Sequence, residues 1–331
     1  MNRIREEFLH CIVYIYASEQ DAENGERRGG SGFLAHVPLE QNGERCIIYA
    51  LTNSHVIKKS GDKPAITINR KDGKRQIFTT NNGDWKFLPN HDVAAVPIGI
   101  DSATHEIRHV GVGNFMTPEL ISKQEIGPGD ETFMVGRFIN HEGKEKNLPA
   151  VRFGYVSMMP YEPIEDEYGV LQESFLVECR SIPGYSGSPV FLNIDFSKPR
   201  PSEAKQARLF LGRGTEQRLL GIDWAHINSY EQVFKKSPKE KTLIRTNLVA
   251  KSNTSMAAVV PAWRIRELLD IEEFKDMRTQ VDAKLTDHKA KLAVTADSAD
   301  ADLQAFTQAD FESALKKASR PISSRPAPKK K

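Results

Sequence analysis

The chain has 331 residues, of which 39% are hydrophobic, and its formal net charge at pH 7 is only +2. This length is enough for about two domains with cores of their own, and the near balance of charge excludes a whole-molecule attraction to nucleic acid or to an anionic membrane. No apolar run approaches the length of a membrane-spanning helix, so we expect no association with a membrane.

Short β-type runs separated by turn residues occupy the first third of the chain. They predict six strands, at residues 8–17, 32–37, 45–51, 65–69, 85–88 and 93–98. The first run contains His10 and follows a segment that is not cleanly basic, which favours a strand over a secretory signal peptide. We therefore expect no secretory leader.

Two residues suited to proton transfer stand beside these strands. His55 follows an apolar run that starts at Cys46 and ends in polar turn residues, and Asp92 stands at the entrance to the strand at 93–98. Taken singly, each has a common structural explanation, because such a histidine often belongs to the core and such an aspartate often caps a turn. Their joint meaning depends on a third residue.

A second set of β-type runs predicts six more strands, at residues 132–137, 151–158, 174–179, 189–194, 219–224 and 256–260. Residues 197–216 and 228–253 are polar and charged, and we expect both to be exposed loops. Each could serve as an exosite or be a solvated insertion.

The third residue is Ser186, which lies in the run Gly-Tyr-Ser-Gly-Ser-Pro that starts at Gly184. Gly184 can adopt backbone angles closed to other residues, so its N–H and that of Ser186 can converge on one oxygen atom. A serine hydroxyl is a weak nucleophile unless an imidazole takes its proton and a carboxylate holds the imidazole. His55 and Asp92 are the candidates for these two roles.

The order His55, Asp92, Ser186 resembles that of the chymotrypsin-like (trypsin-like) serine endopeptidases. Two local sequences resemble most the bacterial branch of the family, the high-temperature-requirement proteases and the glutamyl endopeptidases. They are Thr-Asn-Ser-His-Val around His55 and Ser-Gly-Ser-Pro starting at Ser186. The resemblance runs from about residue 8 to about residue 269 and includes no PDZ-like segment. It implies an all-β fold of two six-stranded antiparallel barrels.

The resemblance also implies a domain division and a site. Residues 1–115 would form the barrel that carries the histidine and the aspartate, and residues 116–270 the barrel that carries the serine. Peptide bonds of a protein or peptide substrate would be hydrolysed through an acyl-enzyme in the cleft between them. The N–H groups of Gly184 and Ser186 would bind the oxyanion.

Two residues bear on substrate preference in the resembling enzymes. Arg180 lies six residues before Ser186, where the floor of the specificity pocket is expected, and would favour acidic P1 side chains. Asp223 falls where glutamyl endopeptidases place the histidine that recognises glutamate, and would favour basic ones. The two could instead pair, or Arg180 could face solvent. We rank these neutral interpretations above either charged pocket.

The C-terminal part begins with a segment of helical periodicity at 262–269, which we expect to close on the second barrel. Residues 271–331 are rich in Ala, Asp and Lys, with possible helices at 281–292 and 303–315 and a basic, Pro-rich, disordered end. This tail could recruit a regulatory protein partner. Nucleic-acid binding would rest on the tail alone and is not expected.

Three cysteines, Cys11, Cys46 and Cys179, lie in apolar runs without the spacing of a disulfide pair or a metal site. Buried free thiols indicate a reducing compartment, so we expect a cytoplasmic bacterial protein. No metal and no other cofactor is expected. The alternative function is a catalytically silent or latent protease fold that acts as a protein-binding module.

Overall fold

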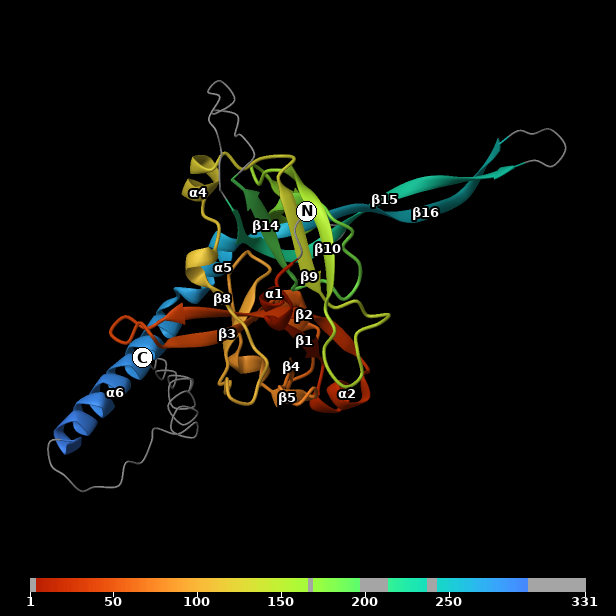
Figure 1. The fold of residues 1–331 in the computed structure, drawn as a ribbon. Coiled ribbons are helices and arrows are strands. Elements are labelled where there is room, and N and C mark those ends of the chain that lie inside the picture. Colours follow the sequence, from red (N-terminus) through yellow and green to blue (C-terminus); the bar gives the residue numbers. More distant parts are fainter. Residues whose placement is uncertain (1–3, 166–168, 197–213, 237–242, 297–331) are drawn as a thin grey trace, which may run out of the picture.

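The computed structural model describes residues 4–165, 169–196, 214–236 and 243–296. Two β-sheets lie against one another, and helices and a long ribbon extend from them (Figure 1). The all-β fold is confirmed. One hydrophobic cluster runs through both sheets, with Phe33 and Tyr49 from the first and Phe191 and Val260 from the second.

The first sheet contains eight strands, where six were predicted. They are β1 (Ile12–Tyr16), β2 (Arg28–Pro38), β3 (Cys46–Thr52), β4 (Ala65–Asn69), β5 (Arg75–Thr79), β6 (Lys86–Phe87), β7 (Ala94–Pro97) and β8 (Val110–Gly111). Their order is β5-β4-β1-β2-β3-β7-β6, and β8 pairs with β2 in parallel. The prediction missed β5 because it is half-buried and mostly polar, and β8 because it has two residues.

Short helices precede, connect or follow these strands. They are α1 (Glu7–His10), α2 (Glu19–Asn24), α3 (Ser54–Lys58) and the 3-10 turns η1 (Asn82–Asp84) and η2 (Val112–Asn114). The predicted first strand was wrong at its start, because residues 7–10 are helical. The Phe8 ring points from this helix into the sheet interface, with its centroid 4.7 Å from that of Phe191.

The second sheet closes into the predicted six-stranded barrel, in the order β10-β13-β16-β15-β14-β9. Its strands are β9 (Glu131–Gly136), β10 (Ala150–Met158), β13 (Phe175–Glu178), β14 (Pro189–Asp195), β15 (Thr215–Lys236) and β16 (Leu243–Pro261). A small hairpin, β11 (Pro163–Glu165) and β12 (Leu171–Glu173), and the helix α4 (Pro118–Lys123) lie outside the barrel pairing.

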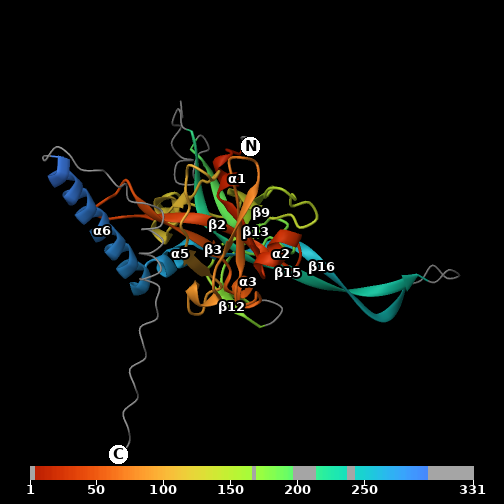
Figure 2. The same cartoon turned by 90° about the horizontal axis from the view of Figure 1, so that it is seen from below.

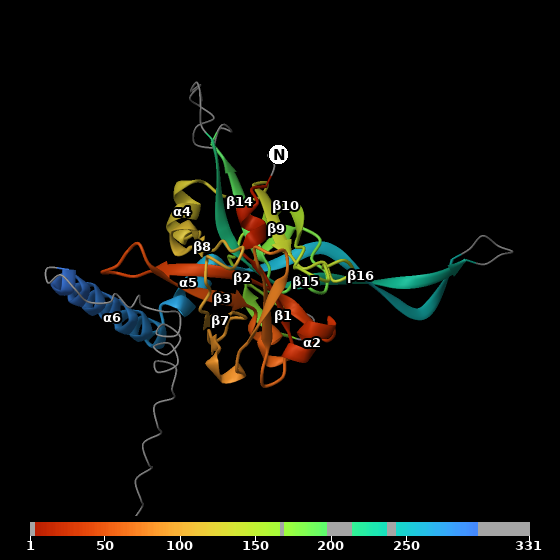
Figure 3. The same cartoon turned by 60° about the horizontal axis from the view of Figure 1, so that its bottom comes forward.

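The predicted loop at 228–253 was wrong, because β15 and β16 continue through it as a two-stranded ribbon that leaves the barrel (Figures 1 and 3). The ribbon pairs residues from Asn228↔Asn253 to Lys236↔Leu243. Most of the ribbon side chains whose burial is described are exposed, so neither face shows the apolar alternation by which strands are recognised in a sequence. Most of the other predicted loop, 197–216, lies outside the described residues.

Two helices end the described chain. The predicted closing helix is confirmed as α5 (Ala262–Leu269), which contacts β15 and β16 and also β7. The helix α6 (Glu272–Ala296) begins nine residues before the predicted start and lies along the β2–β3 hairpin (Figure 2). Arg278 Nη1 donates to the Tyr49 hydroxyl at 3.1 Å, and Asn42 Nδ2 donates to Asp282 Oδ1 at 2.6 Å. The predicted helix at 303–315 and the basic end lie outside the described residues.

In the described part of the chain, no helix combines the length and the apolarity that crossing a membrane requires.

Candidate functional site

The predicted catalytic and oxyanion-binding residues all line one cleft of about 1060 Å³ at the junction of the two sheets. Its lining includes His55 and Asp92 from the first sheet and Gly184 and Ser186 from the segment before β14. His55 lies in the first turn of α3, and that turn is held to the residue before β7 because Ser54 Oγ donates to the carbonyl oxygen of Val93 at 2.9 Å.

The imidazole of His55 and the carboxylate of Asp92 are in direct contact. His55 Nδ1 lies 2.6 Å from Asp92 Oδ2, and the backbone N–H of His55 donates to Asp92 Oδ1 at 2.9 Å. Because a carboxylate can only accept, this contact assigns the proton of a neutral His55 ring to Nδ1 and leaves the Nε2 lone pair free. The Asp92 side chain is 13% exposed, which strengthens a charge-assisted bond.

Two further residues hold Asp92 by its backbone. Asn53 Nδ2 donates to the Asp92 carbonyl oxygen, and the Asp92 N–H donates to Gln172 Oε1, each at 2.8 Å. Gln172 Nε2 also lies 2.8 Å from His91 Nδ1, which accepts when the His91 ring is neutral. Burial, more than the nearby Arg264 cation, lowers the pKa of His91 and favours that neutral ring. Sequence reasoning missed Gln172, because no local pattern marks it.

The turn that carries Ser186 is built on two glycines in the left-handed region, Gly184 (φ +98°) and Gly187 (φ +89°). The Tyr185 N–H donates to the Ile182 carbonyl oxygen at 3.1 Å, and the Gly187 N–H donates to that of Asp223 at 2.8 Å. The N–H groups of Gly184 and Ser186 have no acceptor among the described residues. They are therefore available to an oxygen atom that enters the cleft.

The Ser186 hydroxyl and the His55 ring make no mutual hydrogen bond within 3.5 Å in the described structure. Catalytic hydrogen bonds are often long in ligand-free enzymes and shorten when substrate binds. The arrangement can thus supply a nucleophile, a base, an orienting carboxylate and two donors once Ser186 Oγ approaches His55 Nε2.

The two predicted specificity residues do not line the cleft. Arg180 is exposed, and no ion pair joins it to Asp223 in the part of the chain that the structure describes. Asp223 is completely buried beneath the Ser186 turn and accepts a hydrogen bond from Ser181 Oγ at 2.7 Å. Its Oδ1 has no hydrogen-bond partner in the described part of the chain, and burial raises the pKa of the Asp223 carboxyl to about 7.

This raised pKa predicts a pH-dependent stability. The Asp223 carboxyl ionises near pH 3.8 in the unfolded chain but near pH 7 in the folded one. Its contribution to the free energy of unfolding therefore falls as pH rises above about 4, and the fall levels off above about pH 7. Asp223→Asn should therefore gain free energy of unfolding relative to the parent as pH rises from 5 to 8, by a few kcal/mol at about 1.4 kcal/mol per pKa unit.

Urea unfolding of both proteins at pH 5 and pH 8 measures this gain. The difference in free energy of unfolding between the two proteins is taken at each pH, and the readout is how much this difference changes from pH 5 to pH 8. Effects of the amide that do not depend on pH cancel in this change. A difference that stays constant across this range would contradict an abnormal pKa of Asp223.

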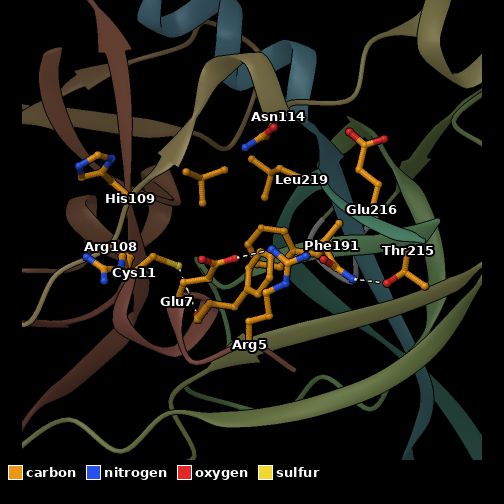
Figure 4. Close-up of a pocket in the computed structure, with 13 residues that line it drawn as sticks. Arg5, Glu7, Cys11, Arg108, His109, Asn114, Phe191, Thr215, Glu216 and Leu219 are labelled. Atoms are coloured by element: carbon orange, nitrogen blue, oxygen red, sulfur yellow. Dashed lines mark hydrogen bonds and ion pairs between the residues drawn. The ribbon is translucent and has the colours of Figure 1, made fainter. Parts of the chain in front are cut away.

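A second cavity of about 320 Å³ contains none of the predicted site residues (Figure 4). It lies between the N-terminal helix and the second barrel, with Cys11 and His109 on one side and Phe191 and Leu219 on the other. Within the described ranges, no group of three His, Cys, Asp or Glu side chains is placed to hold a metal ion.

Comparisons with solved structures give distant likenesses. The chain is similar to Deg5, with 17% identity, a TM-score of 0.38, and coverage of 66% of this chain and 81% of Deg5. It is similar to the Rv3671c protease of M. tuberculosis H37Rv in an inactive form, with 13% identity, a TM-score of 0.40, and coverage of 78% and 87%. It is also similar to the HtrA-type protease AlgW with decapeptide, with 13% identity, a TM-score of 0.39, and coverage of 84% of this chain and 65% of AlgW.

No curated protein matches the sequence. A family comparison does, since the trypsin-like peptidase domain matches residues 30–195, which is half of the chain. The matched segment contains His55, Asp92 and Ser186. The chain therefore belongs to the trypsin-like peptidase family of serine endopeptidases.

Proposed function

We propose that this protein hydrolyses peptide bonds through a triad of Ser186, His55 and Asp92 and an acyl-enzyme intermediate. The observation that carries the proposal is the 2.6 Å contact between His55 Nδ1 and Asp92 Oδ2, in the same cleft as Ser186. The contact supports a basic Nε2 on the cleft side of the ring, which is what a serine nucleophile requires.

In the first step, Ser186 Oγ attacks the carbonyl carbon of the scissile bond while its proton passes to His55 Nε2. The N–H groups of Gly184 and Ser186 bind the oxyanion, and Asp92 stabilises the imidazolium. His55 then gives its proton to the leaving amine as the C–N bond breaks. In the second step, water attacks the carbonyl carbon of the ester while His55 takes the water proton. The bond between this carbon and Ser186 Oγ then breaks, the acid product leaves, and His55 returns the proton to Ser186 Oγ.

We infer that the division into residues 1–115 and 116–270 is functional, because His55 and Asp92 stand on one side of it and Ser186 on the other. Neither half is expected to catalyse alone. The three free cysteines support a reducing, cytoplasmic compartment. Recruitment of a regulatory partner through residues 271–331 stays a prediction.

The test is labelling of the purified protein with a fluorescent fluorophosphonate, which reacts with activated serines. We expect stoichiometric labelling of the parent, and loss of labelling in Ser186→Ala and His55→Ala. Ser60→Ala is the matched control, because Ser60 lines the same cleft but its hydroxyl donates to the Val56 carbonyl oxygen at 2.8 Å. It should label like the parent.

The missing hydrogen bond between Ser186 and His55 favours one alternative, a latent or silent protease fold that binds proteins. Its expected result is a folded parent that does not label. Labelling that appears only after addition of a peptide substrate analogue would identify the latent enzyme.

A further prediction concerns the P1 residue. Arg180 is exposed and Asp223 is buried beneath the turn, so neither side chain lines the cleft. We expect neutral P1 side chains at the sites cleaved in a peptide library, and the same profile for Arg180→Ala. Cleavage concentrated after Asp and Glu, or after Lys and Arg, would contradict this prediction.

A further inference from the structure

The turn that carries Ser186 is held by contacts that begin at a charged side chain in the protein interior. Arg137 directly follows β9, and its side chain is completely buried. A guanidinium stays charged in proteins, so burying one requires compensating partners. We propose that Arg137 is a positioning residue, which keeps the turn in the conformation that leaves the Gly184 and Ser186 N–H groups open to an oxyanion. This inference rests on the proposed function.

Although Arg137 belongs to the second barrel, its side chain is anchored in the first sheet. The guanidinium carbon lies 4.2 Å from the ring centroid of Tyr16 and 4.9 Å from that of Tyr14, within the range of cation–π attraction. Nη1 donates to the Ile15 carbonyl oxygen at 3.1 Å. Nε donates to the buried carboxylate of Glu142. The cation is therefore fixed against β1.

Hydrogen bonds through Ser31 on β2 connect the backbone of Arg137 to the turn. The Arg137 N–H donates to Ser31 Oγ at 2.8 Å, and Ser31 Oγ donates to the Gly184 carbonyl oxygen at 2.8 Å. The Ser31 N–H donates to the Ser186 carbonyl oxygen, also at 2.8 Å. Ser31 thus holds the carbonyl groups of Gly184 and Ser186, whose N–H groups have no acceptor in the described structure, and the Arg137 N–H sets the direction of the Ser31 hydroxyl.

The segment after Arg137 is docked a second time on the first sheet. Asn147 Nδ2 donates to the Thr67 carbonyl oxygen at 2.7 Å, and the Asn147 N–H donates to Asn69 Oδ1 at 2.7 Å. Between the two anchors, Ile139 packs on the turn so closely that a Cβ atom on Gly184 would lie 2.4 Å from Ile139 Cγ2. The connection from β9 to β10 therefore acts as a clamp between the first sheet and the turn.

The experiment compares three variants of the full chain. Arg137→Met/Glu142→Gln removes the cation and the anion together, because removing Arg137 alone would leave a buried charge without its partner. Arg137→Lys keeps the charge but loses the fork that reaches Glu142 and the Ile15 carbonyl oxygen at once. Arg278→Met is the control, since it removes a mostly buried arginine that joins α6 to Tyr49, away from the turn.

We expect kcat for a peptide substrate to fall by about 10- to 100-fold in the double variant, with KM little changed, because a misplacement of about 1 Å at the reacting centre has effects of this size. Arg137→Lys should be intermediate, and Arg278→Met should keep the parent kcat even where it lowers the melting temperature. Amide hydrogen exchange over residues 181–188 should become faster in the Arg137 variants only.

In the folded double variant, amide exchange over residues 181–188 at the parent rate would overturn the inference, and so would the parent kcat. If the double variant does not fold, Arg137→Lys decides by the same two measurements. The two proposals fail separately: a parent protein without activity contradicts the proposed function, while unchanged exchange over 181–188 in the Arg137 variants contradicts the positioning role whatever the activity.

Discussion

Ser186→Ala should lower kcat by about five to six orders of magnitude, the loss typical of a nucleophile removed from a triad. The alanine cannot form the acyl-enzyme, whereas the free Gly184 and Ser186 N–H groups belong to the backbone and survive the substitution. Residual activity of about 10³-fold over the uncatalysed rate is therefore expected, with KM close to that of the parent.

The measurement is single-turnover hydrolysis of a peptide that the parent cleaves. Adding His55→Ala to Ser186→Ala should reduce kcat little further, because the base has no function without the nucleophile. Losses that multiply in the double variant would show that His55 and Ser186 act independently. A Ser186→Ala protein that retains parent kcat would exclude Ser186 as the nucleophile.

The catalytic candidates could be found from the sequence because each lies in a short local pattern. A glycine-flanked serine before a strand, a histidine after a strand and an aspartate before one are each visible within about eight residues. Family order then relates His55, Asp92 and Ser186, which are far apart in the chain, and the structure brings all three to one cleft.

The contacts that position these residues could not be found in this way. Gln172 holds Asp92 across 80 residues, and Arg137 reaches Ser31 across 106. Such pairs exist only through the docking of the two sheets, and nothing in the neighbouring residues marks them. In the same way, the polar β15–β16 ribbon resembles a loop in sequence, because its order comes from cross-strand pairing and not from a buried face.

Asp92→Asn should lower kcat by about 10⁴-fold at neutral pH with little change in KM. Both carboxylate oxygens are in use: Oδ1 accepts from the His55 backbone N–H, and Oδ2 lies 2.6 Å from Nδ1. In the variant, the single amide oxygen is needed by the backbone N–H, so the amide NH₂ must face Nδ1. That forces Nδ1 to accept and moves the ring proton to Nε2, where it blocks proton transfer from Ser186.

Nitrogen NMR of the His55 ring tests this cause separately from the rate. The neutral ring should carry its proton on Nδ1 in the parent and on Nε2 in Asp92→Asn. Gln172→Ala is the matched control, because it removes an acceptor from the Asp92 backbone and leaves both carboxylate contacts possible. It should keep the parent tautomer and lose far less activity. A slow Asp92→Asn enzyme with the parent tautomer would mean that the Asp92 charge, rather than its hold on the proton, is what catalysis requires.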